Sequence, residues 1–333
     1  MHRWRVKLFG RDESRSAAMV SEDFAARTDP YRRELLAYCY RMLGSVHDAE
    51  DLVQETLLRA WRARDSYDAG KASLRTWLYR IATNACLTAL EQRGKRPLPA
   101  GLGGPPGDDP WSPLLPGTEI PWLQPIPDAL ISDPAEAVVA QGSLRLALVA
   151  AMQHLPARQR AVLVLREALD WPAADIAHTL EMSPAAVNSA LQRARKTLSE
   201  HGIHEDDVSE AGDRGAVVDR YVEAFRTADL AELEKLLTDD IELEMPPYLN
   251  WYRGRTSYLD FLARVFALRG SDWRMLPIGA NGQPARAAYN HGPDGYTLHS
   301  VQVFTLTGGR ISHVTVFQDA EVFETFGLAP QLD

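Results

Sequence analysis

One helical face near the middle of the sequence carries side chains suited to reading nucleic acid. The segment PAAVNSALQRARKTLSE places polar and basic residues at its outward positions: Asn188, Ser189, Gln192, Arg193, Arg195 and Lys196. Amides and hydroxyls can hydrogen-bond base edges, and guanidinium or ammonium groups can hold phosphates. This set predicts a nucleic-acid-binding helix.

A second set of residues is acidic. Asp48, Asp51 and Glu55 stand at i, i+3 and i+7, so a helix would align them in one stripe beside its apolar face. Such a stripe can steer and register docking on a basic partner. Carboxylates near a helix N-terminus are also favoured by the helix dipole, so a merely solvated face has the same pattern.

The C-terminal third holds titratable side chains that could line a pocket. The candidates are Asp240, Glu244, Tyr252, His299, His313 and Asp319. In the extended run from Ile311 to Asp319, His313 and Asp319 share one face by alternation, and we expect both to point into one cavity. No spacing indicates a catalytic dyad, so ligand binding or packing is favoured over catalysis.

The elements around the polar face form a helix-turn-helix pattern. WPAADIAHTL is followed by the turn Glu181-Met182-Ser183 and then by the polar helix, with Ser183 as N-cap and Pro184 in the first turn. An ordinary helical hairpin has the same pattern, and only the outward face favours DNA binding. This pair belongs to an all-helical second module, predicted at residues 136–201.

The first module, predicted at residues 22–96, is also helical. YRRELLAYCYRML has a core-facing stripe, Ser45 can cap the helix that carries the acidic stripe, and a third helix is expected over about residues 73–92. A linker over residues 97–135 holds 11 of the 21 prolines and should be extended and irregular. It is either a passive tether or, through Trp111 and PWLQPIPD, a docking segment.

The tail, predicted at residues 213–330, changes from helical to alternating patterns. GAVVDRYVEAFRTADLAELEKLL and TSYLDFLARVFAL read as helices, and ARAAYN, YTLHSVQVFTL and ISHVTVFQ read as strands of an antiparallel sheet. Helices followed by such a sheet predict an α+β domain.

Length and composition agree with several folded domains. The chain has 333 residues, 45% hydrophobic and 24% charged, and its two cysteines exclude a disulfide framework. Residues 1–100 hold 18 Lys and Arg against 13 Asp and Glu, whereas residues 201–333 hold 11 against 21. The first module can therefore meet a polyanion and the tail cannot. No apolar run is long enough to span a bilayer, and we expect a cytoplasmic protein.

The first two modules resemble the sigma-70 family of bacterial RNA polymerase initiation factors, in its extracytoplasmic-function (ECF) group. The resemblance covers most of residues 31–200 and rests on RRELLAYCYRMLGSVHDAEDLVQETLLRAWR, SLRTWLYRIATNACL and LPARQRAVLVLREALDWPAADIAHTLEMSPAAVNSALQRARKTL. The tail, with MPPYLNWYRG and its strands, resembles the SnoaL-like branch of the NTF2-like cone fold. PWLQPIPD is similar to the linker of the subgroup that carries such a tail.

The resemblance implies roles for particular residues. Docking on the polymerase clamp would use Asp48, Asp51, Gln54, Glu55, Arg59 and Trp61. Capture of the −10 element, with a base unstacked, would use Tyr67, Trp77, Arg80, Asn84 and Arg93. Asn84 in IATN matches the family's pattern for base recognition, whereas Trp77 lies on the apolar stripe. The polar helix of the second module would read the −35 element.

The expected fold is two all-α sigma modules, region 2 and the helix-turn-helix region 4, followed by a cone domain. The expected function is promoter-specific initiation with core RNA polymerase, without a cofactor and without enzymatic activity. We expect the acidic tail to dock on the first module, the linker or both and to regulate in cis, with a small-molecule ligand as a further partner. The alternatives are a cone-fold enzyme or a small-molecule sensor fused to DNA-binding modules.

Overall fold

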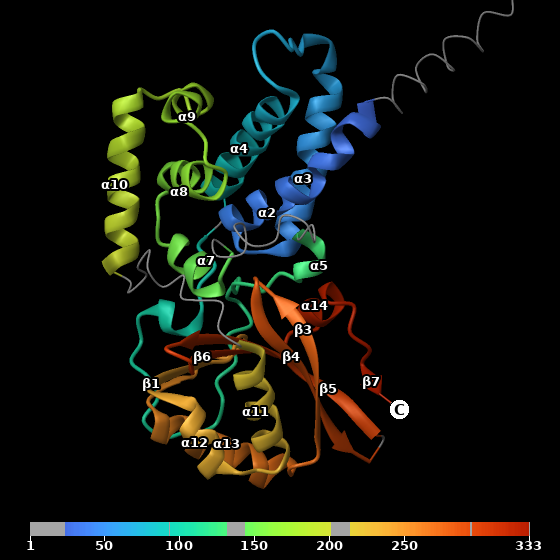
Figure 1. Ribbon diagram of the computed structural model, residues 1–333, viewed down its shortest axis with the longest axis vertical. Coiled ribbons are helices and arrows are strands. Elements are labelled where there is room, and N and C mark those ends of the chain that lie inside the picture. The colour runs from blue at the N-terminus through green and yellow to red at the C-terminus, as the bar shows by residue number, and fades with distance from the viewer. Residues whose placement is uncertain (1–23, 93, 132–143, 201–213, 294, 333) are drawn as a thin grey trace, which may run out of the picture.

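The computed structural model describes residues 24–92, 94–131, 144–200, 214–293 and 295–332. Two helical modules lie side by side at one end, the tail lies at the other, and the linker runs between them (Figure 1). The predicted fold class, two helical modules followed by an α+β tail, is confirmed.

The first module is a three-helix unit with short 3₁₀ turns. Its elements are η1 (Asp29–Tyr31), α2 (Arg32–Leu43), α3 (Val46–Arg62), η2 (Arg64–Ser66) and α4 (Leu74–Gln92). The predicted cap forms, since Ser45 Oγ accepts a hydrogen bond from the Asp48 amide at 3.3 Å. Helix α2 ends at Gly44, whose φ of 70° is the left-handed conformation that glycine adopts without steric cost.

The second module contains the predicted helix-turn-helix. Its elements are α7 (Leu146–Met152), α8 (Ala157–Leu163), a π-helical turn η4 (Val164–Ala168), α9 (Ala173–Thr179) and α10 (Pro184–Glu200). Ser183 caps α10, because its Oγ accepts from the Ala186 amide at 3.2 Å. Val187, Ala194 and Leu198 are buried on the inner face of α10, as the period predicts.

The linker is largely irregular but is not a passive tether. It contains only two short helices over its described residues, η3 (Pro99–Leu102) and α5 (Asp128–Ile131). Trp122, Leu123 and Ile126 are buried, so the PWLQPIPD segment forms part of a core. The docking interpretation of the linker is the one that the structure supports.

The tail is a curved sheet with α11 (Arg214–Arg226), α12 (Leu230–Leu236) and α13 (Arg255–Arg269) on one face and the short helix α14 (Ala320–Thr325) on the other. Its strands are β1 (Leu237–Glu244), β2 (Trp251–Arg253), β3 (Trp273–Ala280), β4 (Gln283–Gly292), β5 (Gly295–Thr307), β6 (Arg310–Phe317) and β7 (Gln331–Leu332). The order is β2-β1-β6-β5-β4-β3, with β7 beside β5.

The three predicted strands, β4, β5 and β6, pair antiparallel as expected, but the whole sheet also contains one parallel pair. Strand β1 pairs with β6 in parallel, while the other pairs are antiparallel. A parallel pair needs a long crossover, and here the chain from β1 to β6 passes through α13 and four other strands of the sheet. The sheet is therefore mixed.

The two faces of this sheet belong to two different cores. Tyr221, Phe261 and Phe304 lie in a core inside the tail, between its sheet and its own helices. Val301 and Phe317 instead belong to a second core that continues through the linker and both helical modules. The tail is thus packed on the rest of the chain as well as on itself.

Candidate functional site

Helix α10 presents the predicted DNA-reading side chains to solvent. The exposed residues are Asn188, Ser189, Gln192, Arg193, Arg195 and Lys196. Arg195 pairs with Glu167 at 2.8 Å, and Lys196 lies 3.8 Å from Glu200. Such exposed pairs are weak and can be exchanged for phosphate contacts at little cost. The helix therefore presents a polar, partly cationic face to solvent.

Helix α3 exposes only part of the predicted acidic stripe. Asp51 and Gln54 are exposed, and Glu55 is half-buried and bonded to Arg59 at 2.7 Å. Asp48 departs from the expectation of a row of accessible carboxylates, because its side chain is only 15% exposed and receives a 2.6 Å bond from Arg96. Asp48 holds the start of the linker in this arrangement.

Trp61 lies at the far end of the same helix and is half-buried. Its ring meets Phe24 edge-on with centroids 5.5 Å apart, and the Arg64 guanidinium lies 3.9 Å from the ring centroid. The contacts of Trp61 in this structure are therefore within the first module.

The predicted −10 residues gather at α4 and the loop before it. Tyr67 and Trp77 are half-buried and pack together with ring centroids 5.1 Å apart. Asn84 is exposed one turn beyond Arg80, which lies 3.8 Å from Glu181. Arg93 lies outside the described residues. This cluster offers aromatic, amide and cationic groups of the kinds that single strands require.

The Arg80–Glu181 pair is one of several contacts between the first and second modules. The rings of Tyr79 and Trp171 meet edge-on at 5.6 Å. Arg160 of α8 donates to the Met42 carbonyl at the end of α2 and to Gln153 Oε1 at 2.8 Å. Burial lowers the pKa of Arg160 to about 10. The two modules are closed against each other.

Asn281 of the tail joins all three other parts of the chain. Its Nδ2 donates to Tyr40 Oη in the first module at 2.8 Å and to the Leu144 carbonyl of the second at 2.7 Å. Its Oδ1 accepts from the linker amide of Ile126 at 3.0 Å. Asn281 is fully buried, and its left-handed φ of 58° begins the two-residue turn between β3 and β4. We call this residue and its three partners the Asn281 clamp.

Neighbouring amides extend the clamp. Gln124 of the linker accepts from Tyr40 Oη at 2.8 Å and from Ser45 Oγ at 2.9 Å. Gln283 accepts from the Leu146 amide at 2.7 Å, and Asp128 accepts from the Gly282 amide at 2.7 Å. The tail therefore docks on the first module and the linker through buried amides and hydroxyls as well as through the shared apolar core. The charge complementarity that motivated the docking hypothesis does not supply these contacts.

The linker also crosses the surface of the tail. The Gly107 amide donates to the Trp251 carbonyl at 2.8 Å, and the Gly117 amide to the Pro247 carbonyl at 2.7 Å. Arg264 of α13 donates to the carbonyls of Pro110 and Ser112 at 2.8 and 2.6 Å. The linker between Gly107 and Gly117 is thus bonded to the tail at both of its ends and in its middle.

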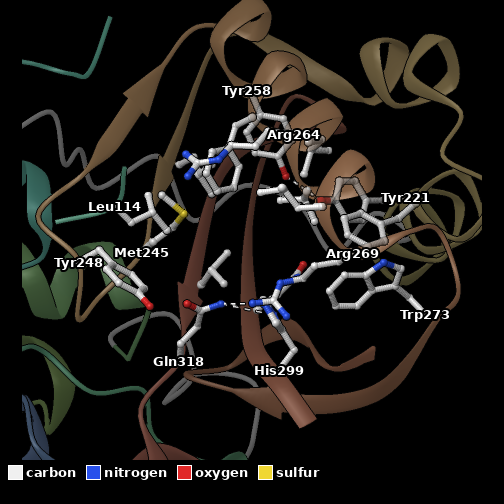
Figure 2. Close-up of a pocket in the computed structure, with 18 residues that line it drawn as sticks. Leu114, Tyr221, Met245, Tyr248, Tyr258, Arg264, Arg269, Trp273, His299 and Gln318 are labelled. Atoms are coloured by element: carbon white, nitrogen blue, oxygen red, sulfur yellow. Dashed lines mark hydrogen bonds between the residues drawn. The ribbon is translucent and has the colours of Figure 1, made fainter. Parts of the chain in front are cut away.

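The tail encloses a cavity of about 190 Å³ beneath its helices. Aromatic side chains dominate its wall, and His299, Gln302 and Gln318 form a polar end; Figure 2 shows Gln318 directed at His299. Gln318 Nε2 lies 3.0 Å from His299 Nε2. Burial, aided by the charge of Arg269, lowers the pKa of His299 to about 4, so its ring is neutral at pH 7.

Only His299 of the six predicted pocket residues lines this cavity. Tyr252 lies under Gly107 of the linker, and Asp319 caps α14 by accepting from the Glu321 amide at 2.9 Å. Glu244 and His313 face the linker instead, because Leu243 and Val316 occupy the cavity face of β1 and β6. The expectation that His313 and Asp319 share one cavity is wrong. Asp240 is exposed.

Glu244 and His313 form a buried pair under the start of the linker. Glu244 is 2% exposed, lies 2.9 Å from His313 Nε2 and accepts from the Ala100 amide at 2.7 Å. Burial opposes protonation of His313, but the hydrogen bond and charge of Glu244, with the charge of Glu242, outweigh it and raise its pKa. The Glu244–His313 pair thus holds the start of the linker through the bond from the Ala100 amide to Glu244.

The raised pKa of His313 makes part of the stability depend on pH. Its contribution is complete below the ordinary histidine pKa and is lost as the pH rises through the raised value. We expect the Tm difference between the wild type and His313→Gln to shrink as the pH rises above the ordinary histidine pKa of about 6.5. His291→Gln, at a half-exposed ring, is the control. A difference that does not change with pH would contradict the assignment.

Within the described ranges, no group of three or more His, Cys, Asp or Glu side chains is placed to hold a metal ion. A search of the same residues finds no helix with the length and hydropathy that crossing a membrane requires.

Comparisons with known proteins divide the chain at similar places. The family model described as Sigma-70 region 2 matches residues 29–96, Sigma-70, region 4 matches residues 145–198, and the SnoaL-like domain matches residues 218–314.

The chain is similar to curated proteins along most of its length. It is 48% identical to the ECF RNA polymerase sigma factor SigG of Mycobacterium tuberculosis, over 93% of this chain and 85% of the relative. It is 33% identical to the ECF RNA polymerase sigma factor SigW of Bacillus subtilis, over 53% of this chain and 86% of that protein. The crystal structure of M. tuberculosis SigJ covers 93% of this chain and 100% of its own, with TM-score 0.64 and 25% identity.

Proposed function

Because the chain belongs to the ECF group of sigma-70 RNA polymerase sigma factors, we propose that its tail regulates promoter-specific initiation by holding the two sigma modules closed. The protein is an initiation factor and not an enzyme; its family implies core RNA polymerase and promoter DNA as partners. The cis regulation, the site residues and any ligand of the tail go beyond the family assignment.

The distance between promoter elements supports this proposal. The −10 and −35 elements lie roughly 25 base pairs apart, which is about 85 Å at 3.4 Å per pair. In the closed arrangement Arg80 of the first module lies 3.8 Å from Glu181 in the helix-turn-helix of the second. One molecule therefore cannot engage both elements until the modules separate.

The Asn281 clamp is the observation that carries the proposal. A single tail residue bonds to the first module, the linker and the second module, so separation of the modules must break at least one of these buried bonds. Each buried polar group left unpaired costs about 1–3 kcal/mol. The tail thus biases the equilibrium between closed and open states by the few kcal/mol that a switch requires.

Run-off transcription tests the proposal directly. Core polymerase with the full chain is compared with core polymerase and a chain that ends after Glu200, on the cognate promoter. We expect more transcript, and tighter core binding, from the shorter chain. Equal yields and equal core affinities over a range of salt concentrations would refute regulation by the tail.

The face of α10 provides a prediction for promoter recognition. Gln192→Ala or Arg193→Ala should weaken binding to the −35 element by about 1–3 kcal/mol, because each exposed side chain reaches a base edge or a phosphate. Binding is measured on the cognate and on a scrambled element. Ser199→Ala, on the last turn of α10, is the control. An equal loss of affinity for the cognate and the scrambled DNA would show that these residues contact phosphates and do not recognise bases.

A further inference from the structure

We propose that the cavity of the tail binds a compact, hydroxyl-bearing aromatic compound, and that Leu114 of the linker forms part of this site. The site would then be shared between the tail and the segment that joins the two sigma modules. The effect of the compound on polymerase rests on the proposed function above, whereas its binding does not.

The size and wall of the cavity define the body of the ligand. Its volume of about 190 Å³ exceeds the ~150 Å³ of an apolar cavity that accepts one benzene ring, so one or two fused rings fit. The aromatic residues that line it are Tyr221, Phe225, Tyr248, Tyr258, Phe261 and Trp273. Rings stack well on such walls.

Gln302 defines the polar group of the ligand. It lines the cavity, is 6% exposed, and its Oε1 has no hydrogen-bond partner among the described residues. A buried acceptor without a donor is costly, so it favours an occupant with a hydroxyl or an N–H at that position. His299 beside it is bonded to Gln318, and Arg269 also lines the cavity, so the polar lining includes a guanidinium as well as neutral groups. Gln302 therefore selects for a hydrogen-bond donor on the ligand.

The linker closes one side of the cavity. Leu114 lines it and lies beside Met245 and Tyr248 in Figure 2. The flanking linker residues are fixed on the tail, since Arg264 holds the Pro110 and Ser112 carbonyls and Leu115 accepts from the Leu249 amide at 2.8 Å. An occupant that touches Leu114 therefore stabilises the linker in its docked position.

Linkage makes this coupling reciprocal. If the docked linker belongs to the closed state, a compound in the cavity must weaken binding to core polymerase by the same factor by which polymerase weakens binding of the compound. Leu114 is the contact through which the coupling passes. The neighbouring Leu115 is 56% exposed and does not line the cavity, so it is a matched control.

Titration of the full chain with 2-naphthol and with naphthalene tests the site. We expect 2-naphthol to bind about tenfold or more tightly than naphthalene, because only its hydroxyl can satisfy Gln302. Gln302→Leu should remove this preference and leave naphthalene binding unchanged, which also shows that the cavity remains folded. No binding of either compound up to its solubility would overturn the site, and equal affinities would overturn the role of Gln302.

A second titration tests the coupling. Saturating 2-naphthol should weaken the affinity of the full chain for core polymerase several-fold, and Leu114→Ala should reduce that effect while Leu115→Ala does not. Binding of 2-naphthol with no change in polymerase affinity would overturn the role of the linker. The proposed function is tested separately, by transcription with the unliganded full chain and with the chain that ends after Glu200. A failure of the ligand experiments does not change the result of that comparison.

Discussion

Charge reversal on α3, by Asp51→Lys together with Glu55→Lys, is expected to raise the Kd for core RNA polymerase by about 100-fold or more. Asp51 is exposed and Glu55 is half-buried on α3, the helix that we propose docks on core RNA polymerase. Opposite charges that meet a basic partner would become like charges, and such juxtaposition costs several kcal/mol. Lysine forms helices as well as glutamate does, so the helicity should be retained.

The matched control carries the same change in net charge elsewhere. Asp260 and Glu324 are exposed in the tail, and Asp260→Lys with Glu324→Lys should leave core affinity within about twofold of wild type. Affinity is measured by titration of labelled chain with core polymerase, and helicity by circular dichroism. An unchanged affinity of the α3 variant would remove Asp51 and Glu55 from the docking surface.

The second large effect is expected at the Asn281 clamp. Asn281→Gly removes the side chain that pairs Tyr40, Ile126 and Leu144. In the closed state the buried Ile126 amide and Leu144 carbonyl lose this partner, whereas Tyr40 keeps its bond to the Gln124 carbonyl. Glycine adopts the left-handed φ of 58° without cost, so the turn between β3 and β4 is retained. We expect core affinity and transcript yield to rise about 10-fold to 100-fold.

Ala228→Gly is the matched control for this variant. Ala228 has a similar φ of 53° and lies in the turn between α11 and α12 of the same domain, away from the clamp. It should change neither core affinity nor yield. If Asn281→Gly behaves like Ala228→Gly, the clamp does not hold the sigma modules closed.

The helical modules could be predicted because their signals are local. Apolar residues recur at helical spacing, and Ser45 and Ser183 cap the helices as their positions predict. The six residues on the outer face of α10 are exposed because Val187, Ala194 and Leu198 fix the inner face. The helical period predicts which residues share a face of a helix, and the apolar stripe predicts which of the faces is buried.

The tail pocket could not be predicted in the same way. The alternation of side chains along a strand predicts which residues share a face of the sheet. Both faces of this sheet are covered, so the alternation does not predict which face lines the cavity. β6 also has register shifts against both neighbouring strands. Its pairing with β1 joins segments far apart in the sequence, and His313 was therefore placed on the wrong side.

The clamp was missed although a local signal for its turn exists. Asn281 and Gly282 are an Asn-Gly pair between two extended runs, which is a strong hairpin signal. That signal predicts the turn between β3 and β4, but not that the Asn281 side chain leaves the hairpin to bond Tyr40. The two residues are 241 positions apart in the sequence, and a local sequence pattern cannot predict a contact between residues so far apart.

The same separation sets an order of events during synthesis. Both sigma modules and the linker have left the ribosome before Asn281 is translated, because residues 201–333 follow them in the chain. At 5–20 residues per second, these last residues take roughly 7 to 27 seconds to synthesise. Each nascent molecule therefore passes through an interval in which its promoter-binding parts exist without their restraint, and this interval lengthens when translation slows.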